Sequence, residues 1–143
     1  MVVKQISVNL ENIPGMFLNI SECLGSEGIN IRAISVADTS SVSTVRFVSD
    51  NPDKTITVLE SNGYSVKETS VIAVEIPDHP GALQAVLKPL MEADINVLYL
   101  YPFLGRGKSN QPIVILGVNK TEKAVDVLKK NWVHTFGEEI YAL

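Results

Sequence analysis

Apolar and polar residues alternate in two stretches of the chain, and both stretches lead into the same kind of segment. The alternating apolar positions are Ile6, Val8 and Leu10 in one stretch and Ile72, Val74 and Ile76 in the other. A period of two is typical of a strand with one buried face. A Pro-Gly turn follows, and apolar residues then recur at helical spacing, at Phe17, Ile20 and Leu24 and at Leu83, Val86 and Leu90. Each half is therefore predicted to begin with a strand and an amphipathic helix.

The two halves are copies of one another. The Pro-Gly turn recurs 66 residues later in the chain, and Ile29-Asn30-Ile31 recurs at the same offset as Ile95-Asn96-Val97. From Val45 onward the offset is 69, so the second copy carries three extra residues, most simply at residues 105–108. An offset that holds in motifs as well as in apolar positions indicates an internal duplication.

The rest of each copy also follows a common order. A second strand begins at Ile29 or Ile95, and a polar loop follows at residues 38–41 or 105–110. A third strand is predicted at residues 42–48 or 113–118. A short helix comes next, which in the first copy has Asn51 as its cap and Pro52 as its first residue. The last strand is predicted at residues 64–68 or 135–142.

This β-α-β-β-α-β order is that of the ferredoxin-like, or split βαβ, unit. The predicted fold class is α+β, with two such domains at residues 1–70 and 71–143. In each domain both helices should cover one face of a four-stranded antiparallel sheet. No Gly or Pro lies between Gly63 and Pro77, so the last strand of the first domain should run directly into the first strand of the second. Such a connection is not a flexible linker, and it predicts a fixed relation between the domains.

Composition narrows the classes of function. Apolar residues make up 45% of the 143 residues, which is enough for packed cores, and the net charge is −4. No basic patch stands out, which argues against nucleic acid and against an anionic membrane surface as partners. The chain has one cysteine, no signal-peptide pattern and no apolar run long enough to span a bilayer. We therefore expect a soluble, cytoplasmic protein.

Two short motifs carry a resemblance to a known family. Residues 10–15, Leu-Glu-Asn-Ile-Pro-Gly, and then residues 28–31, Gly-Ile-Asn-Ile, resemble the signature of the ACT domain, and are especially similar to the regulatory subunit of acetolactate synthase. The second copy keeps a looser version in Asp78-His79-Pro80-Gly81 and Ile95-Asn96-Val97. The resemblance implies two domains paired side by side through their second strands. It also implies that amino acids bind at the junction, where the first loop of one domain meets the second strand of the other.

The residues that the resemblance implicates suit the recognition of a free amino acid. The N-terminus of a helix presents unpaired N–H groups to a carboxylate, and Gly15 would allow a ligand close to the backbone. Pro14 stiffens the loop, and an Asn amide can donate to a carboxylate and accept from an ammonium group. The alternative is that Asn12 and Asp78 only cap their helices and that Pro-Gly is plain turn chemistry. Asn30 and Asn96 are harder to explain in that way, because Asn disfavours a strand unless it has a partner.

Pairing through the second strands would create two sites of unequal quality. We expect Asn12, Gly15 and Asn96 to form the better one, with Ile13 and Met16 beside the loop favouring a ligand with an apolar side chain. Asp78, Gly81 and Asn30 would form a poorer one, because the carboxylate of Asp78 repels a ligand carboxylate unless it turns to the ammonium group. His79 follows in the same loop and is expected to be exposed to solvent.

The strand at residues 96–101 is apolar on both faces, which predicts that Tyr99 and Tyr101 are covered by the other domain or by a second chain, and we expect a homodimer. The leading hypothesis is a stand-alone amino-acid-binding regulatory protein without catalytic activity, acting on an enzyme or another protein. The alternative is a structural interaction module with degenerate sites. An enzyme is disfavoured because Cys23, His79 and His134 lie on separate elements. No cofactor or metal is expected, because phosphate-binding loops and CxxC motifs are absent.

Overall fold

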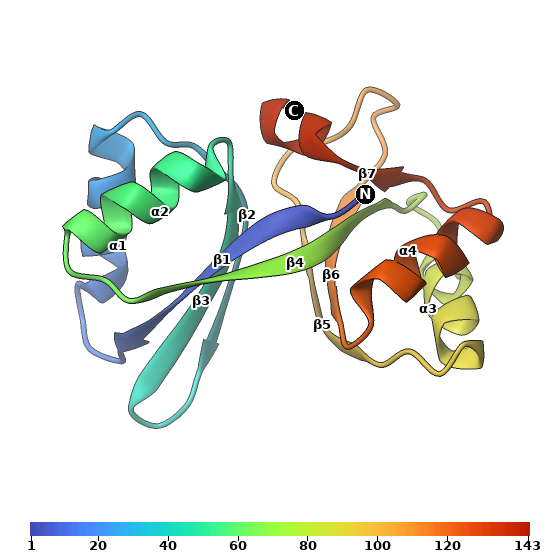
Figure 1. Cartoon of the computed structure of the whole chain (residues 1–143), viewed down its shortest axis with the longest axis horizontal. Coiled ribbons are helices and arrows are strands. Elements are labelled where there is room, and N and C mark those ends of the chain that lie inside the picture. The colour runs from blue at the N-terminus through green and yellow to red at the C-terminus, as the bar shows by residue number, and fades with distance from the viewer. The chain divides into compact units, whose positions relative to one another are not determined.

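The computed structural model describes all residues from 1 to 143. Its elements, labelled in Figure 1, are β1 (Val3–Glu11), α1 (Met16–Ser26), β2 (Ile31–Asp38), β3 (Val42–Ser49), α2 (Pro52–Ser61), β4 (Val66–Glu75), α3 (Ala82–Glu92), β5 (Val97–Pro102), β6 (Ile113–Val118), α4 (Thr121–Lys130), β7 (Thr135–Phe136) and a 3-10 helix, η1 (Glu138–Ala142). None of the helices has the length and apolar character needed to span a bilayer.

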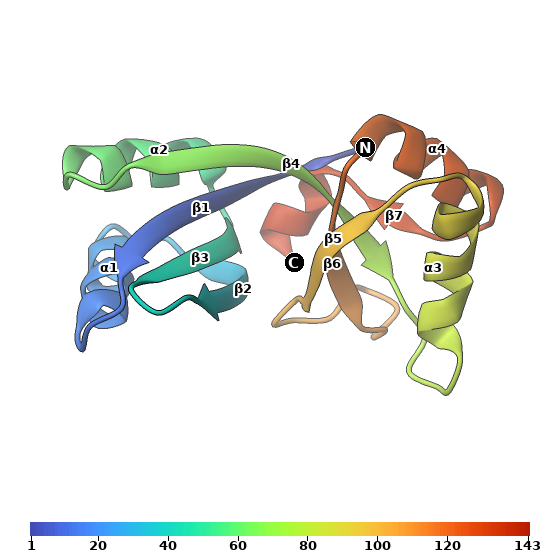
Figure 2. The same ribbon diagram turned by 90° about the horizontal axis from the view of Figure 1, so that it is seen from below.

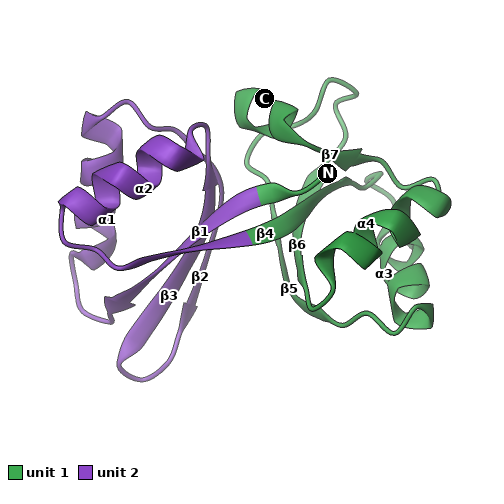
Figure 3. Cartoon of the chain, viewed as in Figure 1, with its two compact units in different colours: residues 1–3, 70–143 green, residues 4–69 purple.

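The chain forms two compact units (Figure 3). The N-terminal unit comprises residues 4–69, and the C-terminal unit comprises residues 1–3 and 70–143. Strand β4 runs without interruption from one unit into the other. The predicted direct passage from the last strand of the first copy into the first strand of the second is therefore confirmed, whereas the domain boundary after residue 70 stays a prediction.

The N-terminal unit has the strand order β4-β1-β3-β2, with antiparallel pairing in which Val8 lies opposite Val45. Helices α1 and α2 cover one face of this sheet (Figures 1 and 2). The alternating apolar residues of β1 point into the core between sheet and helices, as their period predicts. That core comprises Ile6, Val8, Leu10, Ile20, Leu24, Ile29, Val45, Phe47 and Leu59.

The C-terminal unit repeats this architecture with the strand order β7-β4-β6-β5 and with α3 and α4 on one face. Its core includes Ile72, Val74, Ile76, Val86, Leu90, Leu116, Val125 and Leu128. The last, first, third and second strands of each copy thus lie in the same order, which is the ferredoxin-like arrangement. The predicted α+β fold class is confirmed.

Two details differ from the prediction. The last strand was expected over residues 135–142, but β7 has only Thr135–Phe136 and the chain then turns into η1. Within η1, the side chain of Ile140 has no exposed surface. Phe17 and Leu83, expected on the inner faces of their helices, are 39% and 40% exposed, and both lie in the first turn of their helix.

The second helix of each copy supplies a lysine to the end of the first. Lys54 Nζ donates to the carbonyl of Glu27 over 2.7 Å, and Lys123 Nζ donates to the carbonyl of Ala93 over 2.9 Å. A cation near the last carbonyls of a helix balances the negative end of its dipole. The duplication has therefore preserved a specific polar contact as well as the apolar pattern.

Candidate functional site

The loop before α1 ends at Gly15, in a backbone conformation that favours glycine. Gly15 is the N-cap of the helix, with φ at 90° in the left-handed region, and no side chain caps the helix. Asn12 instead turns toward the loop between β2 and β3: its backbone N–H donates to Ser41 over 3.1 Å and its amide makes a long 3.4 Å contact with the carbonyl of Thr39. The alternative in which Asn12 caps α1 is therefore wrong.

The loop before α3 repeats this geometry. Gly81 is the N-cap, with φ at 83°, and again no side chain caps the helix. His79 is exposed, as expected, and its Nδ1 lies 3.0 Å from the carbonyl of Pro80. Asp78 therefore does not cap α3 either, and the first turns of both helices keep their N–H groups without a side-chain partner.

The space in front of α1 is open. A Cβ atom added at Gly15 would meet no atom within 4 Å, and Pro14 beside it is also exposed. Ile13 is 54% exposed, whereas Met16 packs against the core. The exposed apolar side chains beside the loop are thus Ile13 and Phe17, and the expectation that Met16 contributes to the site stays a prediction.

The predicted asparagines mark the starts of the second strands. The backbone N–H of Asn30 donates to Asp50 Oδ1 over 3.0 Å, and the N–H of Asp50 donates back to the carbonyl of Asn30 over 3.0 Å. Asn96 and Asn119 form the same pair, at 2.9 Å and 3.2 Å. Sequence reasoning missed Asp50 and Asn119, although the 69-residue offset relates them and could have drawn attention to them.

Asn96 lies in a hollow of about 260 Å³. The walls are formed by Met91, Asp94, Ile95, Asn96, Asn119 and Lys120. Lys120 Nζ donates to the backbone carbonyl of Asp94 over 3.1 Å and lies 3.8 Å from its carboxylate. The start of β5 is therefore concave and polar, which suits a small polar group of a ligand.

Within one unit the loop and the asparagine lie at opposite ends of the sheet. Glu11 is paired with Val42 at one end of β3, and Ile31 is paired with Ser49 at the other. Seven strand steps separate the two ends by about 23 Å. Asn12 and Gly15 therefore do not meet Asn30 of their own unit. The crossed site of Asn12, Gly15 and Asn96 and its poorer counterpart of Asp78, Gly81 and Asn30 stay predictions.

No three His, Cys, Asp or Glu side chains lie close enough together to hold a metal ion. Partial burial, and secondarily the charge of Glu27, raise the pKa of the Cys23 thiol, which disfavours the reactive thiolate. Cys23 packs against the core, as expected of a structural cysteine.

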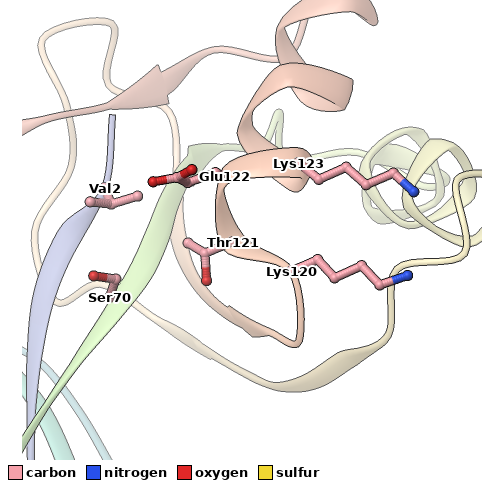
Figure 4. A pocket seen from close by; sticks show the side chains of 6 residues that line it. All are labelled: Val2, Ser70, Lys120, Thr121, Glu122 and Lys123. Carbon is pink, nitrogen blue, oxygen red and sulfur yellow. The ribbon is translucent and has the colours of Figure 1, made fainter.

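A larger hollow, of about 440 Å³, lies at the start of α4 beside Val2 and Ser70 (Figure 4). Its walls include Lys120 and Lys123, which at first sight suggest an anion site. Figure 4 shows both side chains extending away from Val2 and Ser70, and their ammonium groups bind the carbonyls of Asp94 and Ala93. The two lysines stabilise the end of α3, so this hollow lacks the free cations that an anion would require.

The chain thus consists of two ferredoxin-like units in tandem, each with a helix that begins behind a left-handed glycine and has no side-chain cap. The model of the ACT domain pair matches residues 1–141. The chain therefore belongs to the family of ACT domain pairs.

Several solved structures share this fold. Protein BT0572 from Bacteroides thetaiotaomicron is 31% identical, with a TM-score of 0.91 over 100% of this chain and 98% of that one. The regulatory subunit of aspartate kinase from Thermus thermophilus, in its ligand-free form, is 14% identical, with a TM-score of 0.63 over 90% of this chain and 92% of that one. A structure of aspartokinase alpha and beta subunits is 18% identical, with a TM-score of 0.59 over 90% and 91%. No match is found among curated proteins.

Proposed function

We propose that this protein is a cytoplasmic regulatory protein whose ACT domain pair binds an amino acid and has no catalytic activity. The observation that carries the proposal is the uncapped N-terminus of α1 behind Gly15, whose φ is 90° and whose surroundings are open. A ligand carboxylate would accept hydrogen bonds from the free N–H groups of the first turn and would complement the helix dipole. The exposed side chains of Ile13 and Phe17 favour a ligand with an apolar side chain.

The second half of the site would come from the start of a second strand. Asn96 carries an exposed side-chain amide, and its hollow is large enough for an ammonium group. We place Asn12, Gly15 and Asn96 in the better site and Asp78, Gly81 and Asn30 in the poorer one. The reason for the ranking is the carboxylate of Asp78, which repels a ligand carboxylate.

The second strands are also the proposed dimer contact. Strands β2 and β5 each have a single hydrogen-bonded neighbour in the chain, so each leaves one edge of backbone groups open. Leu98 and Leu100 on β5 are 57% and 42% exposed. Pairing of these edges in a homodimer would cover apolar surface and satisfy the backbone. Tyr101 is 3% exposed within the single chain and Tyr99 is half-buried, so a second chain is not required to cover Tyr101.

We propose an enzyme as the partner, because the regulatory subunit of aspartate kinase has a similar fold. Binding of the amino acid would shift the arrangement of the paired domains and hence the affinity for that enzyme. The second candidate function is a structural interaction module, which Asp78 at the second loop favours.

A thermal-shift screen against the twenty amino acids separates the two candidates. A ligand at 100 times its dissociation constant adds about 2.7 kcal/mol of stability. For a chain of this size that corresponds to a rise of roughly 5–10 °C in melting temperature. If no amino acid raises the melting temperature at millimolar concentration, the interaction module is the better description.

A further inference from the structure

A separate hollow of about 410 Å³ lies in the C-terminal unit, at the sheet rather than at the helix N-termini. The residues of its wall that matter for recognition are Glu75, Lys108, His134, Phe136, Glu139 and Leu143. None of them belongs to the loops or strand starts of the proposed amino-acid sites. The hollow therefore calls for its own explanation.

Side chains of the paired strands β4 and β7 form the floor of this hollow. Ala73 is paired with Phe136, and the N–H of Glu75 donates to the carbonyl of His134 over 3.0 Å. Glu75 and His134 are thus cross-strand neighbours on the same face. The ring of His134 meets the ring of Phe136 edge-on, with centroids 4.6 Å apart. Because Ile72 and Val74 face the helices, these three side chains lie on the opposite face of the sheet.

Two segments in which the second copy differs from the first, residues 105–110 and η1, form the walls of this hollow. The loop at residues 105–110, where the three extra residues fall, closes on itself: Arg106 Nη1 donates to the carbonyl of Asn110 over 2.8 Å, and the N–H of Asn110 donates to Gly107 over 2.9 Å. A Cβ atom at Gly107 would lie 3.4 Å from the ring of Phe136. The other wall is η1, which replaces the expected continuation of the last strand. The hollow is thus a product of the two features by which the copies differ.

The charges in the hollow are available to a ligand. Glu139 accepts hydrogen bonds from the backbone N–H groups of Gly137 and of Glu139 itself, and these bonds, with a smaller contribution from His134, lower the pKa of its carboxyl group. Glu75, Lys108 and Glu139 take part in none of the ion pairs of the chain. The hollow therefore contains two carboxylates, of Glu75 and Glu139, and one ammonium group, of Lys108. The side chains of Phe136 and Leu143 add apolar surface beside them.

We propose that this hollow binds a small organic ammonium compound whose apolar group packs against Phe136 while its ammonium group is held by Glu75 and Glu139. The excess of carboxylates favours a positively charged ligand, and bonds between charged groups are the stronger hydrogen bonds. Such a ligand can be a simple amine or the amino group of an amino acid, in which case Lys108 is placed to receive the carboxylate. The site is independent of the two amino-acid sites proposed above.

Three probes that share one aromatic group test the proposal on the full-length chain: tyramine, tyrosine and 3-(4-hydroxyphenyl)propionate, measured by isothermal titration calorimetry. Tyramine or tyrosine should bind and the propionate should not. Glu75→Gln and Glu139→Gln should each weaken binding about tenfold, as expected for loss of a charged hydrogen bond. Lys108→Met should weaken tyrosine only, which identifies whether the ligand is an amine or an amino acid.

Two controls keep this result separate from the proposed function. Asp126→Asn removes an exposed carboxylate on α4 outside the hollow and should leave binding unchanged. Gly15→Val should abolish binding at the α1 site and leave the binding of tyramine unchanged. The proposal is overturned if no ammonium probe binds at millimolar concentration, if the propionate binds as well as tyramine, or if both glutamine variants bind like the wild type.

Discussion

The ring of Tyr99 lies directly on Gly117, its partner across β5 and β6. A Cβ atom at position 117 would overlap the ring. Tyr101 extends the contact, with its ring stacked 6.4 Å from that of Tyr99. A glycine inside a strand leaves a gap in the side-chain layer, and here an aromatic ring from the neighbouring strand fills it.

Gly117→Ala should therefore destabilise the protein. The added methyl group has no room unless the Tyr99 ring moves, and overpacking of this kind costs about 1–3 kcal/mol. The measurement is the free energy of unfolding in urea. Gly25→Ala is the matched control, because Gly25 lies in α1 and an added Cβ meets nothing within 4 Å. That change should stabilise the helix by about 0.5–1 kcal/mol, so equal effects at both positions would refute the packing argument.

Trp132→Gly should stabilise the C-terminal unit. Trp132 follows α4 with φ at 63° and is 94% exposed, whereas Gly63 holds the corresponding position after α2 with φ at 86°. A left-handed conformation costs a non-glycine residue roughly 1–2 kcal/mol. The glycine variant would remove this cost, but part of the gain is offset because glycine raises the conformational entropy of the unfolded chain. Thermal unfolding should show a higher melting temperature, and Gly63→Ala should lower it. A Trp132→Gly variant with a lower melting temperature would mean that the indole makes a stabilising contact that offsets its strain.

Gly15→Val should remove most of the melting-temperature rise that the bound amino acid causes, and Gly81→Val should remove less. Because φ at both positions is positive, each variant also carries backbone strain, so the ligand-induced shift must be compared with the same variant without ligand. Gly15→Asn is the control for strain, since Asn tolerates this backbone conformation better than Val. If Gly81→Val abolishes the shift and Gly15→Val leaves it, the ranking of the two sites is reversed.

Cys23 should react slowly with iodoacetamide near pH 8. Burial and Glu27 raise its thiol pKa, so the thiolate fraction is smaller than for an unperturbed cysteine and should increase only at higher pH. The rate of alkylation, followed by mass spectrometry against free cysteine from pH 7 to pH 10, checks the direction. Addition of the amino-acid ligand should not change the rate, because Cys23 is not in the proposed sites. Fast alkylation at neutral pH would contradict the raised pKa and would favour a reactive role for the thiol.

The sequence by itself determined the duplication, the order of elements and the core faces of the strands. These features are recorded in local periodicity: alternation reports which side of a strand is buried, and helical spacing reports which side of a helix is buried. Asn51 before Pro52 likewise marks a helix start, and its side chain does accept from the N–H of Lys54. The repeated offset adds that both copies should adopt the same fold.

Only the tertiary structure decided which polar groups meet. Asn12 turns to the β2–β3 loop instead of capping α1, Asn30 and Asn96 pair with Asp50 and Asn119, and the chain leaves β7 for a 3-10 helix. Each of these contacts joins residues far apart in the chain or depends on what interior space is left to fill, as with Ile140. Local patterns carry no record of strand register across the sheet, and register is what brings Glu75 beside His134 and the Tyr99 ring onto Gly117.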